Sequence, residues 1–376
     1  MTPRELDTDP RSAEPATWPA EALTAIRALN AEVLDPMKQR FVGKSEIIDL
    51  LGIALVAGEN LFLLGPPGTA KSALVREFAR RIAGRSFEYL LTRFTEPNEI
   101  FGPFDIRRLR EGELVTNTTN MLPEADLVFL DELLNANSAI LNSLLTVLNE
   151  RVLRRGLETF ELAVLSVIGA SNRLPEDEAL GALFDRFLIR VRCDNVEPER
   201  LADVLDAGWR LERARPIDPS GVTPDAIRSL AALVSRVDLS VLREDYVSWI
   251  ARVRQAGIPI SDRRAVKLQR LVAASAILCG RSEARHSDLW VLRHTWDTEE
   301  QEEILASIVD HALVSATDED HARHPQSHRS HRPDPEVLAR DLEAIAAEFE
   351  RGAVPERERV RLVDRLSTIE DRAEWI

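Results

Sequence analysis

Two hydrophobic patterns alternate along the first half of the chain: short, continuous apolar runs and longer stretches with helical spacing. The runs that predict buried strands lie at 61–64, 86–94, 125–130 and 158–172. The stretches that predict helices lie at 21–38, within 40–60, at 72–82 and at 138–153. Strands alternating with helices favour an open, parallel α/β sheet. Between 95 and 123 the pattern is that of loops, with a small hairpin expected at "GELV" (112–115).

The second half of the chain has a different pattern. Strand signals stop near Glu197, and residues 197–296 show helical spacing only. We expect a small all-helical domain there, with its core anchored by tryptophans. These tryptophans are Trp209, Trp249, Trp290 and Trp296. Residues 297–376 predict three more helices, interrupted by a His-rich linker at 314–334, and three helices of this size can form a bundle.

Composition limits the possible classes of protein. The 376 residues carry a net charge of −15, which disfavours a dedicated nucleic-acid binder because such proteins present basic surfaces. No apolar run approaches the roughly 20 residues that span a bilayer. Cys193 and Cys279 lack metal or redox spacing, which favours a reducing cytoplasm. Residues 1–20 are acidic and Pro-rich without an apolar core, so we expect a flexible tail rather than a secretion signal.

The segment "GPPGTAKS" (65–72), between a strand and a helix, resembles a phosphate-binding loop but has Ala70 where the pattern has Gly. Gly65 and Gly68 would allow tight turns close to phosphate oxygens. Lys71 could then reach the β- and γ-phosphates, and the hydroxyl of Ser72 could ligate Mg²⁺. We expect Ala70 to begin the helix with a helical φ, where Ala costs no strain. The alternative is an ordinary turn with a chance Lys-Ser pair.

Polar residues end two later strand candidates. Asp131 and Glu132 follow the buried run "LVFL", where adjacent carboxylates are costly unless they have a function. Asp131 would hold the Mg²⁺ shell through water, and Glu132 would orient and polarise the attacking water. The alternative is an acidic helix N-cap. Asn172 ends the next strand and could reach the space between γ-phosphate and water, although a turn-forming Asn explains it equally well.

These three motifs, in this order, resemble those of the AAA+ ATPases. "GPPGTAKS", "LPEADLVFLDELLNANSAILNSLLTVLNER" and "ASNRLPEDEALGALFDRFLIRV" are similar to the MoxR branch, and within it to the RavA subgroup. The resemblance covers residues 41–296. It implies a P-loop AAA+ parallel sheet core (21–196), an all-helical lid domain (197–296) and a C-terminal helical bundle (297–376).

The resemblance also implies roles for individual residues. Arg186, in "ALFDRF", corresponds to an arginine finger that enters the neighbouring subunit's site. Arg263, in "SDRRA", corresponds to the lid's second sensor, although Asp262 replaces the family's Pro and Arg264 is an adjacent alternative. A solvated helix face would also explain these arginines. ATP contacts are expected from Val42, Gly43, Gly65, Pro66, Pro67, Gly68, Thr69, Ala70, Lys71, Ser72 and Ala73.

The resemblance also leads to expectations for three further segments of the chain. Residues 98–122 resemble the helix-2 insert and 150–162 a hairpin, both of which usually face the ring pore or a partner. RavA proteins carry a β-rich domain inserted in their C-terminal section, and only the His-rich linker stands there in this chain. The spacing of the linker histidines suggests a metal site, but prolines argue against a helix, so we favour a disordered polar tether. These residues are His321, His324, His328, His331, Pro325 and Pro333.

Together with the motifs, the resemblance implies an Mg²⁺- and ATP-dependent remodelling ATPase that forms a homo-oligomeric ring, most simply a hexamer. The family implies a von Willebrand factor A-domain (vWA) protein as partner. Three alternatives remain open: a metal-chelatase motor subunit, a nucleotide-gated binding module and a DNA motor. The acidic charge disfavours the last of these.

Overall fold

The computed structural model describes residues 18–155, 158–175, 178–213, 221–314 and 324–328, together with Leu342, Ile345 and Leu366. Most of the expected N-terminal tail and the two last predicted helices therefore lie outside the described residues. Among these residues, no helix is both long enough and apolar enough to cross a membrane.

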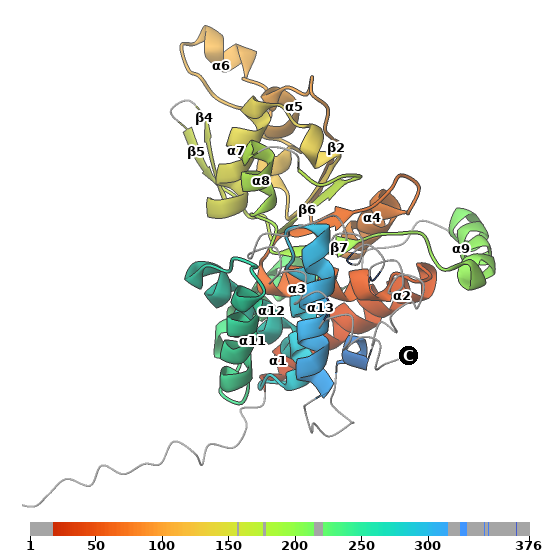
Figure 1. Ribbon diagram of the computed structural model, residues 1–376. Coiled ribbons are helices and arrows are strands. Elements are labelled where there is room, and N and C mark those ends of the chain that lie inside the picture. The colour runs from red at the N-terminus through yellow and green to blue at the C-terminus, as the bar shows by residue number, and fades with distance from the viewer. Residues whose placement is uncertain are drawn as a thin grey trace, which may run out of the picture.

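The centre of the molecule is a five-stranded parallel sheet (Figure 1). Its spatial order is β2 (Ser86–Leu90), β3 (Leu127–Asp131), β6 (Ser166–Ser171), β1 (Leu61–Leu64) and β7 (Ile189–Arg192). The predicted parallel α/β sheet is confirmed. The hydrophobic pattern did not predict strand β7. The single strand expected at 158–172 is wrong, because a break at 162–165 divides it into β5 (Glu158–Glu161) and β6.

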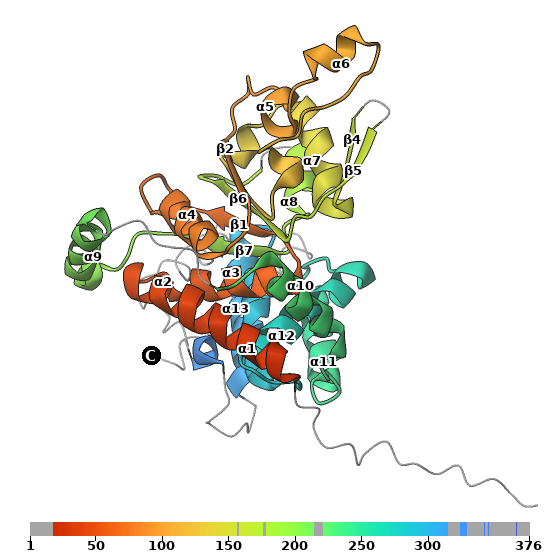
Figure 2. The ribbon, with the colours of Figure 1, turned by 180° about the vertical axis from the view of Figure 1, so that it is seen from behind.

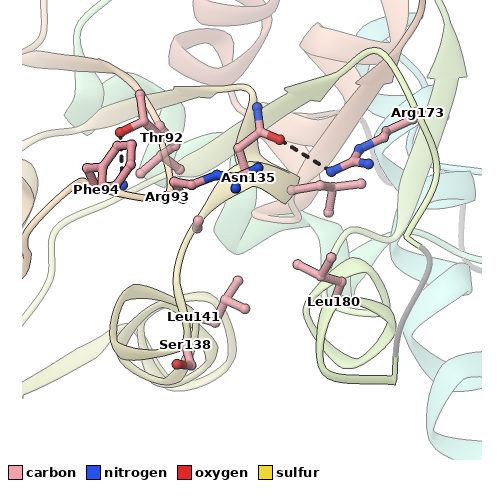
Figure 3. A pocket seen from close by; sticks show the side chains of 11 residues that line it. Thr92, Arg93, Phe94, Asn135, Ser138, Leu141, Arg173 and Leu180 are labelled. Carbon is pink, nitrogen blue, oxygen red and sulfur yellow. Dashed lines mark hydrogen bonds between the residues drawn. The ribbon is translucent and has the colours of Figure 1, made fainter.

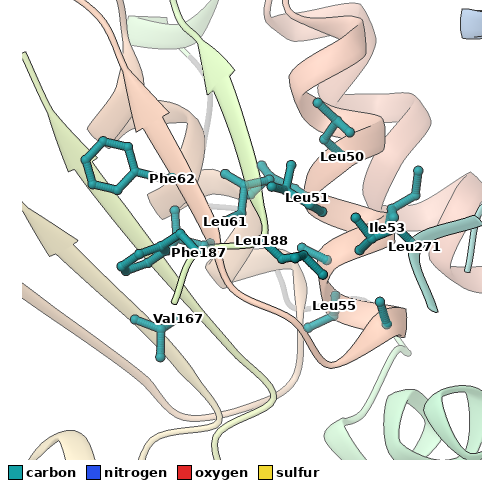
Figure 4. Packing of buried hydrophobic residues seen from close by; sticks show 14 of the residues in the cluster. Leu50, Leu51, Ile53, Leu55, Leu61, Phe62, Val167, Phe187, Leu188 and Leu271 are labelled. Carbon is teal, nitrogen blue, oxygen red and sulfur yellow. The ribbon is translucent and has the colours of Figure 1, made fainter. Parts of the chain in front are cut away.

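Helices cover both faces of the sheet. On one face lie α3 (Ser45–Ala57) and α4 (Lys71–Arg81), and on the other α7 (Ser138–Glu150) and α8 (Glu178–Phe184). Side chains of β1 alternate between the two layers, as Figure 4 shows. Leu61 packs toward α3, whereas Phe62 makes an edge contact with the ring of Phe184, at 4.9 Å between centroids. This alternation explains why β1 is apolar at every position.

The insert and the hairpin lie together at one end of the molecule (Figures 1 and 2). The insert holds α5 (Pro97–Phe101) and α6 (Ile106–Arg110), and the expected hairpin consists of β4 (Val152–Arg155) and β5, paired antiparallel. The guanidinium of Arg155 joins them by donating to the carbonyl of Gly102. No hairpin forms within 112–115. Instead, residues 103–105 pair with 115–117 across α6.

The helical region lies at the opposite end (Figure 2). It comprises α10 (Pro224–Leu233), α11 (Arg243–Gln255), α12 (Asp262–Leu278), a 3₁₀ segment (His286–His294) and α13 (Glu299–Val314). Helix α12 packs on α3, and α13 packs on the 3₁₀ segment and α11. The N-terminal helical segment consists of α1 (Ala20–Ala28), a π-helical turn (Leu29–Leu34) and α2 (Asp35–Arg40).

Three of the four predicted tryptophan anchors are buried. Trp249, Trp290 and Trp296 are at most 2% exposed. The expectation is wrong for Trp209, which is 61% exposed on α9 (Leu201–Arg213). Figures 1 and 2 both show α9 standing apart from the body of the molecule. An apolar helix face therefore does not by itself identify a core residue.

Part of the His-rich linker is ordered, contrary to the tether expectation. Residues Pro325–His328 form a 3₁₀ turn, and the ring of His324 stacks on Trp290 with centroids 4.8 Å apart. Gln326 donates to the carboxylate of Asp49 at 2.5 Å. Burial lowers the pKa of His324 to about 3, with the charges of Lys38 and Arg281 acting in the same direction. No cluster of three potential metal ligands occurs in the described part of the chain, and His321 and His331 lie outside it.

Candidate nucleotide-binding site

The predicted phosphate loop connects the carboxyl end of β1 to the first turn of α4. A Cβ atom at Gly65 would lie 2.3 Å from the carbonyl oxygen of Cys193, so only glycine fits beside the end of β7. Gly68 has a φ of 86°, which glycine adopts without strain. The thiol of Cys193 also approaches the carbonyl oxygen of Thr69 at 3.3 Å. Close packing against β7 and one left-handed turn thus explain both glycines.

Ala70 does not have the helical φ expected of it. Its φ is 68° and its ψ 18°, in the left-handed region, and it is the N-cap of α4 because its carbonyl accepts from the N–H of Leu74 at 2.9 Å. An N-cap residue lies outside the helix proper, so helical dihedrals are not required of it. Left-handed backbone is unfavourable for alanine by about 1–2 kcal/mol. Ala70 is therefore strained, the opposite of the expectation.

Lys71 and Ser72 begin α4 and face the loop and β3. The ammonium of Lys71, a residue that is 8% exposed, donates to the carbonyl oxygens of Gly65 at 2.6 Å and Pro66 at 2.9 Å. The hydroxyl of Ser72 donates to Oδ2 of Asp131 at 2.7 Å. A hydroxyl and a carboxylate side by side are hard oxygen ligands that suit Mg²⁺, which also keeps several waters. The donor set at this point therefore fits the expected ion.

Asp131 and Glu132 lie where β3 ends. Oδ1 of Asp131 accepts from the N–H of Glu132 at 3.0 Å, and Glu132 has a left-handed φ of 51°. That backbone conformation turns the chain sharply after the strand. The carboxylate of Glu132 accepts from Nδ2 of Asn135 at 3.3 Å. Adjacent carboxylates thus have different partners, Ser72 for Asp131 and Asn135 for Glu132.

Asn172 directly follows β6, the strand between β1 and β3. Because the sheet is parallel, the carboxyl ends of these three strands meet at one edge. Asn172 is exposed there. The fold therefore places Asn172 at the same edge as the phosphate loop and the two carboxylates, as the sequence motifs imply.

Val42 and Gly43 lie before α3, against a segment that sequence reasoning missed. Gly43 has a φ of 73°, and a Cβ there would lie 2.8 Å from Cγ1 of Val196. The ammonium of Lys44 donates to the carbonyl oxygen of Asp194. The chain that follows β7 thus forms the wall beside the expected adenine contact. The apolar run "FLIRV" (187–191) was the signal that could have revealed this strand and its exit.

The expected arginine finger lies at the amino edge of the sheet, where the parallel strands begin. Asn60 immediately precedes β1, and its Nδ2 donates to the carbonyl oxygen of Arg186 at 3.1 Å. Lys71 follows the opposite end of the same strand. The side chain of Arg186 is 34% exposed and lies 3.5 Å from the carboxylate of Asp185. One chain therefore does not bring Arg186 to its own phosphate loop.

The adjacent arginines of α12 have different environments. Arg264 is 13% exposed and donates to both oxygens of Asp297 at 3.0 Å and to the carbonyl of Thr295 at 2.7 Å. Arg263 is exposed, with one long contact of 3.4 Å to Oδ1 of Asn149 near the end of α7. The neighbouring carbonyl of Leu148 accepts from Asn60, which places this contact at the amino edge of the sheet as well.

Buried Arg190, on β7, supports the Arg264 network. Its guanidinium lies 2.6 Å from Asp297 and 4.4 Å from the ring centroid of Phe184. Burial lowers the pKa of Arg190 to about 10, while Asp297 opposes the shift, so Arg190 stays charged at neutral pH. Arg190 and Arg264 share one carboxylate and join β7 and α8 to the helical region.

Comparison with known proteins agrees with this architecture. A family model of the MoxR domain in MoxR-vWA-beta-propeller ternary systems matches residues 27–232, and a model of the AAA lid domain matches 236–309. The chain belongs to the MoxR family of AAA+ ATPases. Its α/β core with a helical lid is the P-loop AAA+ fold.

Individual proteins are also similar to this chain, in sequence or in fold. Uncharacterized protein MJ0812 of Methanocaldococcus jannaschii is 35% identical over 74% of each chain. Chaperone MoxR1 of Mycobacterium tuberculosis is 26% identical over 60% of this chain and 56% of its own. The crystal structure of a putative ATPase from Cytophaga hutchinsonii has a similar fold, with a TM-score of 0.63, 19% identity and coverage of 80% of this chain and 97% of that one.

Proposed function

We propose that this MoxR-family chain hydrolyses ATP as a subunit of a ring, in which each active site is built from two neighbouring chains. One observation carries the proposal: the phosphate loop and the candidate finger Arg186 lie beyond opposite ends of β1. A finger that cannot reach its own loop can serve the next subunit of a head-to-tail ring. A closed ring of six, as the family resemblance implies, is the simplest assembly of this kind.

The residues at the carboxyl edge divide the chemistry between them. Lys71 and the loop N–H groups of 65–70 would bind the β- and γ-phosphates. Ser72 and Asp131 would hold Mg²⁺, which neutralises charge on the phosphate oxygens. Glu132 would orient the attacking water and accept its proton, and Asn172 would position that water against the γ-phosphate. The two carboxylates have separate partners, which supports separate roles for them.

The amino edge would supply positive charge to the neighbouring site. Arg186 would stabilise the charge that develops on the γ-phosphate, and Arg263 would act as the second sensor. The partners of Arg264 support this choice, because Arg264 is committed to Asp297 and Thr295, whereas Arg263 makes one long contact with Asn149 among the described residues. Residues 98–122 and 150–162 would project toward the pore or a partner.

The proposed role is a chaperone-like motor with a vWA-domain partner in the cytoplasm, closest to the RavA subgroup. The matched family model is described for MoxR-vWA-beta-propeller systems, and one relative is named a chaperone. Both descriptions belong to other proteins and support the proposal by similarity. The RavA assignment depends on the sequence motifs that resemble that subgroup.

Substitution of Glu132 by Gln tests the proposal directly. The variant should bind ATP, assemble into rings and hydrolyse ATP at least about 100-fold more slowly, because it lacks the general base. Turnover is measured by phosphate release, and assembly by light scattering after size-exclusion chromatography. Glu244→Gln, at an exposed position on α11, is the matched control and should behave as the parent protein. Parental turnover in Glu132→Gln would refute the assigned role.

A further inference from the structure

The two edges of the central sheet hold their polar side chains in different ways. At the carboxyl edge an open cavity of about 820 Å³ lies beside Glu132, bounded by the loop after β2, by α7 and by α8 (Figure 3). At the amino edge, the side chain that contacts the backbone of Arg186 is that of Asn60, which is only 2% exposed. A buried amide is costly unless it is hydrogen-bonded, so the partners of Asn60 show what it holds in place.

The side-chain amide of Asn60 makes four hydrogen bonds, one for each of its donor hydrogens and acceptor lone pairs. Its Oδ1 accepts from Nη2 of Arg151 at 2.9 Å and from the N–H of Val167 at 3.2 Å. Its Nδ2 donates to the carbonyl oxygens of Arg186 at 3.1 Å and Leu148 at 3.4 Å. Both donors meet the oxygen and both carbonyls meet the amino group, so only one orientation of the amide satisfies all four partners.

Arg151 determines this orientation from the end of α7. It is the C-cap residue of α7, and its carbonyl accepts from the N–H of Leu162 at 2.8 Å, at the base of the β4–β5 hairpin. Its guanidinium also donates to the carbonyl oxygen of Gly58 at 3.4 Å. Because a guanidinium has donors but no acceptor, the oxygen of Asn60 must face Arg151. The amino group of Asn60 must then face the other way, toward the carbonyl of Arg186.

The backbone at Arg186 is held from two directions. The next residue, Phe187, is fully buried, and its ring packs on that of Phe62 with centroids 5.4 Å apart (Figure 4). The carbonyl of Arg186 itself accepts from Asn60. The side chain of Arg186, by contrast, is 34% exposed and lies 3.5 Å from Asp185. The structure thus fixes the peptide from which the candidate finger extends, while the guanidinium end is partly open to solvent.

We propose that Asn60 is a positioning residue for hydrolysis in the neighbouring subunit: it sets the peptide from which Arg186 extends, and Arg151 sets the amide of Asn60. This inference rests on the proposed function, in which Arg186 acts on the γ-phosphate of the next chain. A finger that acts across an interface has to be aligned by its own chain, because its phosphate-binding partners lie in another. Misplacement of an active-site group by about 1 Å can cost roughly 100-fold in rate.

Two substitutions of Asn60 test its effect on the reaction. Asn60→Ala removes all four hydrogen bonds, whereas Asn60→Asp keeps the volume and the bonds accepted from Arg151 and Val167, and loses those that Nδ2 donates. Each variant should lower kcat about 10- to 100-fold. The Kd for a fluorescent ATP analogue should stay within about 3-fold of the parental value, because the phosphate loop is intact.

Ser166→Ala is the matched control for these substitutions. The hydroxyl of Ser166, a residue that is 2% exposed, donates to the carbonyl oxygen of Glu59 at 2.8 Å, one residue before Asn60. Its loss also removes a buried hydrogen bond from this edge but none that reaches Arg186, so kcat should be parental. Phosphate release measures turnover, and melting curves verify that each variant is folded.

Mixing experiments separate a positioning role from a loss of structure. Asn60→Ala retains Lys71, and Lys71→Ala retains both Asn60 and Arg186, so a mixed ring contains interfaces in which an intact loop meets an intact finger. An equal mixture should exceed the rate of Asn60→Ala alone and reach up to about a quarter of the parental rate. Asn60→Ala mixed with Arg186→Ala has no aligned finger and should not exceed that rate. Asn60→Asp should behave as Asn60→Ala does.

Three results would overturn the inference. Parental kcat in both Asn60 variants would show that the amide does not position the finger. An equal fall of kcat in Ser166→Ala would show that any lost hydrogen bond at this edge slows hydrolysis. No recovery of either Asn60 variant with Lys71→Ala, when Arg186→Ala does recover with Lys71→Ala, would place the defect in the variant's own phosphate loop. If Arg186→Ala also fails to recover, the site shared by two chains is refuted, and the proposed function falls together with this inference.

Discussion

The two edges of the central sheet differ in what each has assembled. The carboxyl edge brings Lys71, Ser72, Asp131 and Glu132 close together, and direct contacts link Ser72 to Asp131. The amino edge presents arginines that do not meet any phosphate-binding group of their own chain. Under the proposed function, each edge of the sheet therefore supplies one half of a site. A neighbouring subunit would have to complete the site, because β1 separates Arg186 from the phosphate loop of the same chain.

The amino edge itself contains two classes of arginine. Arg190 and Arg264 are buried or nearly so and share the carboxylate of Asp297. Arg186 and Arg263 are more exposed, and their contacts with Asp185 and Asn149 are longer, at 3.5 and 3.4 Å. Buried, paired arginines are committed to the fold, whereas the exposed pair can reach another molecule. Three predictions test these comparisons, beginning with the largest effect.

The division of the site between two chains predicts complementation between two inactive variants. Lys71→Ala disables the carboxyl edge and Arg186→Ala the amino edge, and each alone should lower ATP turnover by about 10³-fold or more. In a mixed ring, a subunit with intact Lys71 can meet a neighbour with intact Arg186. An equal mixture should therefore recover up to about a quarter of the parental rate, because one interface in four is complete.

The control for this mixing experiment replaces the Lys71→Ala subunit with the double variant Lys71→Ala, Arg186→Ala. Mixed with Arg186→Ala, it supplies no intact finger, so no activity should return. Phosphate release is measured across a range of mixing ratios. Absence of recovery at every ratio in the first mixture would contradict the assignment of Arg186 in trans.

The contrast between Arg263 and Arg264 predicts opposite outcomes for two adjacent substitutions. Arg264→Ala leaves the charge of Asp297 less compensated and should lower the free energy of unfolding by roughly 2–3 kcal/mol. Arg263→Ala removes one long surface contact and should change stability by less than about 0.5 kcal/mol, while turnover falls at least about 10-fold. Urea denaturation and ATPase assays on both variants separate the two effects. Normal turnover in Arg263→Ala would remove it as the sensor.

Much of the carboxyl edge was predictable from the sequence because local patterns determine it. Apolar runs located β1, β3 and β6, and the residues that end them lie at a common edge because the sheet is parallel. Strand β7 was missed because Arg190 and Arg192 interrupt its apolar run. Arg190 is buried through its pairing with Asp297, a distant residue that no local pattern reveals.

Other differences also arise from tertiary contacts. Trp209 has the spacing of a core residue, yet α9 lies apart from the body of the chain. His324 was expected in a disordered tether, but its ring stacks on the ring of Trp290. The cavity beside Glu132 combines a loop, two helices and the exit of β6, so its lining is spread from residue 91 to 180. Such sites have no signature in sequence.

The smallest expected effect concerns the strained residue of the phosphate loop. Ala70→Gly should leave the free energy of unfolding unchanged or raise it by up to about 1 kcal/mol, because relief of the left-handed φ outweighs the added entropy of the unfolded chain. Ala73→Gly, inside the first turn of α4, is the matched control and should lower stability by about 1 kcal/mol. Thermal and urea unfolding of both variants measure the difference. A loss of stability in Ala70→Gly as large as in Ala73→Gly would mean that Ala70 is helical in solution. Helix α4 would then begin one residue earlier.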